Sequence, residues 1–378
     1  MRRSPIYFIV TLLIVSSATT GFAQFSFDGS LFVDGVERTY ILHLPTETIE
    51  ESVGLPLVFN LHGYTSNAAQ QQFYSGMDAT ADANNFIVCY PEGIDNAWNI
   101  GIAGGSTADD VAFISAMIDE FSNTYQINTK RVYSCGMSNG GFMSYELACK
   151  IPEKIAAIAS VTGSMVNNID CDLNTTGMPV LQIHGTADQV VPYAGGNGFM
   201  SMDNLLEFWT VKNGCLEDLL TITPTADTDT TDGSTVEHFI YSQCDTDYNV
   251  ELLKVNGGEH TWPGASLTFL GVTNQDISAN DEIWKFFSRY TLDGTATSVN
   301  ETQVNDLVIS PVPADQTLQV TLSSGQINQI TLHDANGHQV MNTQGKSHLD
   351  VGHLPAGYYV LCLLTDDEVL TKRVIIQH

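Results

Sequence analysis

The stretch GMSNGG at residues 136–141 is the most informative part of this chain. It follows residues 131–135, which predict a buried strand, and it precedes residues 142–150, which predict a helix. A serine in such a tight strand-to-helix turn has a strained backbone, because only residues without a Cβ can crowd next to it. The turn exposes the hydroxyl of Ser138 and directs the next backbone N–H, that of Asn139, toward a developing negative charge.

Two later segments supply the partners that a reactive serine needs. Residues 180–183 predict a buried strand, and the loop after it carries Asp188. Residues 250–255 predict another strand, and a glycine-rich loop after it carries His260. A nucleophile, an acid and a histidine in this chain order, each after the carboxyl end of a strand, are typical of the α/β-hydrolase fold. We therefore predict a catalytic triad of Ser138, Asp188 and His260.

Competing interpretations of these residues are few. His238 is the other histidine between Asp188 and the C-terminal tail, and it lies in a strand-like run that indicates a structural role. The remaining alternative is a serine in an ordinary turn, a capping aspartate and an unrelated histidine. Triads are recognised by joint geometry and role, and three suitable residues in the right order favour the catalytic interpretation.

A fourth segment predicts the second donor for the developing charge. Residues 55–61 are nearly all apolar and predict a strand, and the sequence HGYT follows at residues 62–65. A loop of this kind after the third strand supplies a backbone N–H to the oxyanion in such hydrolases. We assign this role to the N–H of Tyr64, beside that of Asn139. The alternative is a loop that needs Gly63 only for its turn.

The order of predicted elements favours an α/β-hydrolase fold, a mostly parallel sheet with helices on both faces. The sequence Asp34-Gly35 predicts a two-residue hairpin turn near the start. Helices that alternate with the buried strands are expected at residues 108–125, 141–151, 202–212 and 280–288.

The longer motifs resemble a known esterase family. LHGYTSNA, CYPEG, AWN, DDVAFI, GMSNGGFMSYELAC, HGTAD and GGEHTWPG, spread over roughly residues 25–290, look like the polyhydroxybutyrate depolymerase and feruloyl esterase family. The resemblance implies a secreted serine esterase without a cofactor or metal, which splits esters of hydroxyalkanoates or feruloyl and acetyl esters of plant polysaccharide. It assigns the triad to Ser138, Asp188 and His260. Trp98 and Trp262 either stack on a ferulate or sugar ring of the substrate or belong to the core.

The N-terminus predicts secretion. Residues 1–3 are basic, residues 6–16 are apolar and residues 21–23 form a small-residue cleavage site, so residues 1–23 are a predicted signal peptide and Gln24 begins the mature chain. The apolar run is too short to span a membrane comfortably, although an uncleaved anchor is the alternative.

The charge balance excludes some partners. The chain has 14 basic and 43 acidic residues, and removal of the signal peptide takes away Arg2 and Arg3, which leaves a net charge of −31. Such a protein repels nucleic acid and anionic membrane surfaces. The densest acidic tract, residues 227–233, is out of register for a calcium loop and predicts a solvated hairpin loop instead.

Seven cysteines indicate an oxidising compartment with at least one bridge. We predict a disulfide between Cys215 and Cys244, which would close a loop of about 30 residues ahead of His260 and stabilise the fold by roughly 3–4 kcal/mol. A second pair, Cys149 and Cys171, is an open alternative. Cys89, Cys135 and Cys362 are left over: the first two lie in apolar strands and indicate buried thiols, and Cys362 lies in the tail.

The C-terminal part has a different pattern. Residues 24–293 form the predicted catalytic domain, residues 294–303 a polar linker, and residues 304–378 about seven short alternating strands that predict a small all-β sandwich. The sequences PVPA, DANG, LPAGYY and the basic pair KR resemble the C-terminal sorting domain of type IX secretion, although Val312 replaces the usual asparagine. A carbohydrate-binding module is the alternative for this domain.

Two function classes follow from these observations. The first is a secreted serine esterase whose partners are an ester substrate and the type IX secretion machinery. The second is a non-catalytic secreted binding protein on a hydrolase scaffold, which would not need all three triad residues together.

Overall fold

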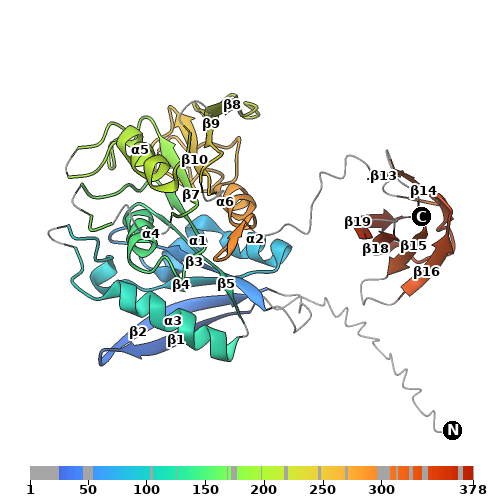
Figure 1. The fold of residues 1–378 in the computed structure, drawn as a ribbon, viewed down its shortest axis with the longest axis horizontal. Helices are drawn as coiled ribbons and strands as arrows, with labels where there is room; N and C mark the ends of the chain where they lie inside the picture. The colour runs from blue at the N-terminus through green and yellow to red at the C-terminus, as the bar shows by residue number, and fades with distance from the viewer. Residues whose placement is uncertain are drawn as a thin grey trace, which may run out of the picture. The chain divides into compact units, whose positions relative to one another are not determined.

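The protein divides into two compact units, residues 1–296 and 297–378, in the computed structural model (Figure 1). The boundary falls inside the predicted linker. The structure describes residues 25–45, 54–102, 105–125, 127–167, 169–171, 177–196, 198–216, 220–245, 248–268, 271–295, 307–311, 314–322, 327–333, 339–364 and 369–377. The predicted signal peptide, residues 1–23, lies outside the described residues.

A ten-stranded sheet runs through the first unit in the order β1-β2-β4-β3-β5-β6-β7-β10-β9-β8. The six strands from β4 to β10 in this order are parallel, and two antiparallel strands extend the sheet at each edge. The strands are β1 (Phe25–Val33), β2 (Val36–Leu44), β3 (Leu55–Leu61), β4 (Ile87–Pro91), β5 (Ile127–Met137), β6 (Ala157–Val161), β7 (Val180–Gly185), β8 (Leu220–Pro224), β9 (Thr235–Tyr241) and β10 (Val250–Asn256).

Helices cover both faces of this sheet, as predicted. Side chains of α3, α4 and α5 pack in one hydrophobic cluster, and those of α1, α2 and α6 pack in another. The helices are α1 (Ala68–Ser75), α2 (Met77–Asn84), α3 (Asp110–Thr124), α4 (Asn139–Lys150), α5 (Met202–Asn213) and α6 (Ala279–Phe287), with a short 3-10 helix η1 (Ile94–Asn96).

The central strands explain why a parallel sheet could be predicted from the pattern of apolar residues. In β3, Leu57 and Phe59 enter one cluster while Val58 enters the other, so both faces of the strand are buried. Strands buried on both faces are continuous apolar runs without polar alternation, and this pattern is typical of parallel sheets. The predicted hairpin turn is confirmed: Asp34 and Gly35 have positive φ values of 49° and 80°, and they connect β1 to β2.

The second unit is a small sandwich of two antiparallel sheets. One sheet has the order β13-β14-β17 and the other β16-β15-β18-β19, and residues from both share one core that includes Leu318, Leu332 and Leu361. The predicted turn at residues 336–337 lies outside the described residues. The strands are β13 (Leu307–Ser310), β14 (Thr317–Leu322), β15 (Gln329–His333), β16 (Gln339–Gln344), β17 (His348–Asp350), β18 (Gly357–Leu364) and β19 (Val369–Ile376), and a two-stranded ribbon, β11 (Tyr290–Thr291) with β12 (Gly294–Thr295), closes the first unit.

Two disulfides lie in the first unit. Cys215 bonds Cys244, as predicted, and Cys149 bonds Cys171, the pair left open above. Cys89 and Cys135 are buried free thiols, and burial raises the pKa of both thiols. Across the described residues, no helix has the length and apolar character to cross a membrane.

Loss of the Cys215–Cys244 bridge should destabilise the first unit. The bridge joins residues 29 positions apart, so replacing both cysteines with alanine should lower the free energy of unfolding by about 3–4 kcal/mol. Urea unfolding without reductant measures this change. The matched control replaces Cys149 and Cys171, 22 positions apart, and should lose a similar amount. An unchanged unfolding midpoint for the first variant would contradict the bridge, and a non-reducing peptide map checks both pairs.

Candidate active site

Ser138 occupies the turn between β5 and α4 in a strained conformation. Its φ is 54° and its ψ is −119°, a region that costs a non-glycine residue on the order of 1–3 kcal/mol. Its N–H donates to the carbonyl of Val161 at the end of β6, at 2.8 Å. The neighbouring strand therefore holds the turn in place.

Three glycines make this turn possible because other chain segments pass directly against them. A Cβ on Gly140 would lie 2.1 Å from the carbonyl oxygen of Leu61 in β3. A Cβ on Gly136 would lie 2.6 Å from the carbonyl carbon of Gly140, and one on Gly141 would lie 2.4 Å from Oγ of Ser160. Any side chain at these positions would push α4 away from the sheet, so the glycines of the motif are a packing requirement.

Asp188 and His260 come from different strands and form a hydrogen-bonded pair. Nδ1 of His260 lies 2.7 Å from Oδ2 of Asp188. The other carboxylate oxygen accepts the N–H groups of Val190 and Val191 at 2.8 and 2.9 Å. Because a carboxylate only accepts, the imidazole proton belongs on Nδ1, and Nε2 is left as the basic nitrogen.

The surroundings keep Asp188 ionised. Its side chain is fully buried, and burial alone would raise its pKa. The hydrogen bond and charge of His260, together with the N–H of Val191, outweigh burial and hold the pKa of Asp188 below its usual value. The acid is therefore a permanent anion near neutral pH.

A second histidine supports the loop that carries Asp188. Nε2 of His184 donates to the carbonyl of Val191 at 2.8 Å, and Nδ1 of His184 accepts from the amide of Gln182 at 2.9 Å. Burial lowers the pKa of His184, so its ring is neutral and serves only as a fixed hydrogen-bonding group.

The strand order places these residues at one edge of the sheet. Ser138 follows β5, Asp188 follows β7 and His260 follows β10, and β5, β6, β7 and β10 are consecutive parallel neighbours. The loop after β3 reaches the same edge, because a Cβ on Gly63 would lie 3.5 Å from Cβ of Ser138. Open α/β sheets bind their ligands outside this edge.

Neither N–H group predicted as an oxyanion donor has a hydrogen-bond acceptor among the described residues. Asn139 is the first residue of α4, so its N–H has no acceptor within the helix. No described residue accepts the N–H of Tyr64. The carbonyl of Gly63 accepts from Nδ1 of His62 at 2.8 Å and from the N–H of Ser66 at 3.1 Å. The C=O and N–H of a trans peptide point in opposite directions, so the N–H of Tyr64 faces away from these partners.

His62 fixes this peptide because both of its ring nitrogens are engaged. Nε2 accepts the N–H of Gly93 at 2.9 Å, which places the proton on the Nδ1 that donates to Gly63. Burial lowers the pKa of His62 to about 4, so the ring is neutral near pH 7. The carboxylate of Glu92 lies 3.8 Å from Nε2, beyond hydrogen-bonding distance, and does not offset the effect of burial.

Of the two alternatives for Trp98, stacking on substrate is wrong, because its side chain is 0% exposed. Its Nε1–H donates to the carbonyl of His62 at 2.8 Å, and its backbone N–H donates to Oδ1 of Asn139 at 2.7 Å. The indole also packs on the ring of His62, with centroids 4.9 Å apart. Trp98 therefore joins the two segments that carry the predicted oxyanion donors.

The same correction applies to Trp262, whose side chain is 1% exposed. Its backbone N–H donates to the hydroxyl of Tyr74 and its Nε1–H donates to Oδ1 of Asn280, both at 3.1 Å. These bonds tie the loop of His260 to α1 and α6. The core interpretation of both tryptophans holds.

Several residues with these supporting roles had no assignment from the sequence. His62 and His184 each lie at or beside the end of an apolar strand, and a buried histidine must find partners for both ring nitrogens. That rule would have marked them as structural, without saying which loop each one holds. Tyr74 and Asn280 are far from the motifs in sequence and carry no such signal.

The other acidic and histidine groups are structural. The tract at residues 227–233 connects the antiparallel strands β8 and β9, so the predicted hairpin loop is confirmed. Nε2 of His238 lies 2.8 Å from the carboxylate of Glu251, which also pairs with Arg289, and this confirms the structural interpretation of His238. Within the described ranges, no group of three or more His, Cys, Asp or Glu side chains is arranged to hold a metal ion.

Comparison with known proteins agrees with this architecture. Residues 106–222 match the Phospholipase/Carboxylesterase family, and residues 308–377 match the secretion system C-terminal sorting domain. The first unit has an α/β-hydrolase fold, and the second carries the sorting-domain match. The first matched range includes Ser138 and Asp188 and ends before His260. The assignment of His260 therefore rests on its hydrogen bond to Asp188.

Three curated relatives are named as esterases. The chain is 28% identical over 264 residues to the bifunctional acetylxylan esterase/xylanase XynS20E of Neocallimastix patriciarum, covering 69% of this chain and 34% of that protein. It is 30% identical over 222 residues to feruloyl esterase B of Piromyces equi, covering 54% and 39%. It is 25% identical over 274 residues to feruloyl esterase D of Neurospora crassa, covering 68% and 84%. The chain therefore spans only about a third to two fifths of the length of the first two.

The neutral state of His62 predicts a pH-dependent contribution to stability. Its pKa is about 4 in the folded protein and about 6.5 in the unfolded chain, so between these values the unfolded chain binds more protons and stability falls as pH falls. His62→Gln removes this titration. The stability difference between wild type and variant should shrink by about 2–3 kcal/mol from pH 7.5 to pH 4.5. Urea unfolding at several pH values measures it, and a constant difference would contradict a buried neutral His62.

Proposed function

We propose that this carboxylesterase-type hydrolase cleaves carboxylic esters with Ser138 as nucleophile, His260 as general base and Asp188 as the residue that orients His260. The observation that carries the proposal is the 2.7 Å Asp188–His260 hydrogen bond at the sheet edge where the strained turn carries the half-buried Ser138. The bond fixes the tautomer that leaves Nε2 of His260 basic, which a general base requires.

The proposed reaction has two halves. Oγ of Ser138 attacks the ester carbonyl while Nε2 of His260 takes the hydroxyl proton, and the N–H groups of Tyr64 and Asn139 hold the oxyanion of the tetrahedral intermediate. Collapse of that intermediate breaks the bond to the alcohol, which receives the proton from His260. Water then attacks the acyl enzyme by the same route and releases the acid and the free serine. Asp188 stabilises the imidazolium in both halves.

The proposed substrates are feruloyl or acetyl esters of plant polysaccharide. The named relatives are feruloyl and acetylxylan esterases, and this favours polysaccharide esters over the hydroxyalkanoate esters also implied by the motifs. A side-by-side assay with methyl ferulate, acetylated xylan and polyhydroxybutyrate separates the classes. Preference for polyhydroxybutyrate would reverse this order.

The proposed location is outside the cell or on its surface. The sorting domain at residues 308–377 supports export by the type IX machinery, after a first passage directed by the predicted signal peptide. A net charge of −29 suits a protein that must stay soluble and avoid anionic surfaces.

Ser138→Ala should abolish ester hydrolysis. Removing the nucleophile of a triad lowers the turnover rate by about ten-thousandfold or more. The measurement is kcat/KM on p-nitrophenyl acetate, with labelling by a fluorophosphonate as a second readout: one label per wild-type chain and none on the variant. Ser122→Ala, a half-buried serine on α3 whose hydroxyl donates to the carbonyl of Asp119, is the control and should keep wild-type activity. Variant activity within tenfold of wild type would remove Ser138 from its role.

A chain that ends at residue 296 should remain an active esterase and lose export. The first unit contains its own core and every residue of the proposed site, so kcat/KM on a small soluble ester should match that of the full-length protein. In a bacterium with the type IX machinery, the truncated protein should collect in the periplasm. Normal export would contradict the sorting role, and export with reduced activity only on insoluble polysaccharide would indicate a carbohydrate-binding module.

A further inference from the structure

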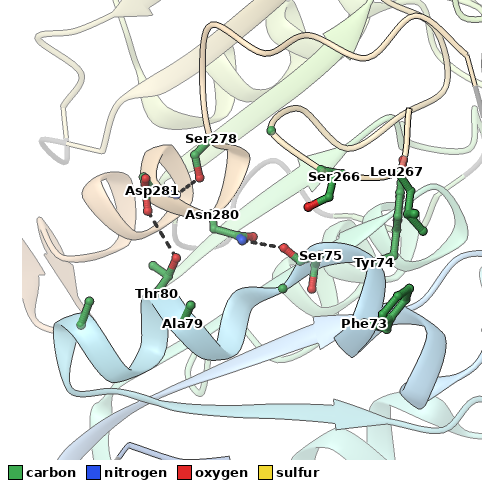
Figure 2. A pocket seen from close by; sticks show the side chains of 14 residues that line it. Phe73, Tyr74, Ser75, Ala79, Thr80, Ser266, Leu267, Ser278, Asn280 and Asp281 are labelled. Carbon is green, nitrogen blue, oxygen red and sulfur yellow. Dashed lines mark hydrogen bonds between the residues drawn. The ribbon is translucent and has the colours of Figure 1, made fainter. Parts of the chain in front are cut away.

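A pocket of about 500 Å³ borders the loop that carries His260, and the reaction above does not use it. Figure 2 shows that the two walls of this pocket differ in polarity. Phe73, Tyr74 and Leu267 make one side apolar and aromatic. The opposite side is polar, with the side chains of Thr80, Ser278 and Asp281.

Hydrogen bonds hold the floor and the polar wall of the pocket. Nδ2 of Asn280 donates to the carbonyl of Ser75 at 2.7 Å, and both residues are at least nine-tenths buried. Oγ1 of Thr80 donates to one carboxylate oxygen of Asp281 at 3.3 Å, which joins α2 to α6. A cavity of this volume with an apolar wall and a few fixed polar groups has the usual dimensions of a small-molecule site.

Phe73 presents an exposed aromatic ring at the edge of the pocket. It is 75% exposed on α1, beside a pocket that it helps to line. A ligand that packs on this ring would remove apolar surface from water. The polar wall offers hydroxyl groups that donate and accept and a carboxylate that accepts.

The charge and the few ligands of the pocket select against anions and metal ions. Asp281 is the charged side chain among the residues that line it, and the whole chain carries a net charge of −29, so an anionic ligand would be repelled. A single carboxylate does not hold a metal ion, which needs several ligands. A neutral ring with one apolar face and several hydroxyl groups fits both walls, and that is the chemistry of a sugar residue.

The pocket is linked by hydrogen bonds to the loop that carries His260. Gly264, which lines it, is four residues from His260 in the same loop. Trp262, between them, donates to Tyr74 on the apolar wall and to Asn280 on the floor. A ligand in this pocket would therefore contact the groups that hold the His260 loop.

We propose that this pocket binds a sugar ring of the alcohol portion of the substrate. The inference rests on the proposed function in so far as the bound sugar belongs to an ester, and it adds where the polysaccharide is held. Phe73 packs on the apolar face of the ring, and Asp281 and Thr80 hydrogen-bond its hydroxyl groups. These are specificity residues that take no part in bond breaking.

The test compares Phe73→Ala with Phe32→Ala. Phe32 is 68% exposed on β1 and does not line the pocket, so it is a matched control. The substrates are an acetylated xylo-oligosaccharide and p-nitrophenyl acetate, which has no sugar. Phe73→Ala should lower kcat/KM on the oligosaccharide about tenfold more than on the small ester, mainly through KM, as expected for loss of one ring-face contact. Phe32→Ala should leave both values at the wild-type level. Asp281→Asn should repeat the pattern of Phe73→Ala.

A binding measurement separates this inference from the proposed catalysis. Calorimetric titration of the Ser138→Ala protein with unesterified xylohexaose needs no turnover, so it tests the pocket even if wild type hydrolyses no ester. Binding that weakens with Phe73→Ala added and persists with Phe32→Ala added supports the pocket. Equal losses on both esters, equal effects of the two phenylalanine variants, or no oligosaccharide binding would overturn it.

Discussion

The strained backbone of Ser138 is the constraint on which the rest of this site depends. A serine with φ of 54° persists only where the surrounding structure overdetermines it. Here β3, β6 and α4 approach so closely that a Cβ on Gly140 would lie 2.1 Å from the carbonyl oxygen of Leu61. The same close approach brings the loop after β3 beside Ser138. This packing therefore holds the proposed nucleophile next to Gly63, which precedes the proposed oxyanion donor Tyr64.

Buried side chains with fully used hydrogen-bonding groups preserve this arrangement. Trp98 and His62 link the loop after β3 to the start of α4, and Trp262 holds the loop of His260. Because these groups are desolvated, loss of a partner would leave an unsatisfied polar atom in the core. Burial also sets their charge: His62 and His184 are neutral, while Asp188 stays an anion because His260 and backbone N–H groups stabilise it. The positions of the site loops are therefore fixed by these buried hydrogen-bonding side chains.

The residues proposed for hydrolysis and the sorting-domain match lie in different units. The first contains the parallel sheet, both disulfides and every residue proposed to act in hydrolysis. The second is a small sandwich with a separate core and the sorting-domain match. Within the first unit, the proposed sugar pocket borders the His260 loop, so α1 and α6, which hold that loop through Trp262, also line the pocket.

Helices α1 and α2 were not expected from the sequence, but its local pattern was sufficient for helices α3 to α6, the buried strands that precede the site residues, the turn at Asp34-Gly35, the elbow at Ser138 and the chain order of Ser138, Asp188 and His260. Each of these depends on short-range chemistry: apolar runs, turn residues and glycines that must pack closely. The roles of Trp98, Trp262 and His62 were decided only by the tertiary structure. An aromatic residue beside a motif has the same local signature whether it faces substrate or core, and which way it faces depends on segments far away in the chain, such as the contact of Trp262 with Tyr74, 188 residues away. The pocket beside the His260 loop has the same origin, because its walls come from segments about 200 residues apart that no local pattern brings together.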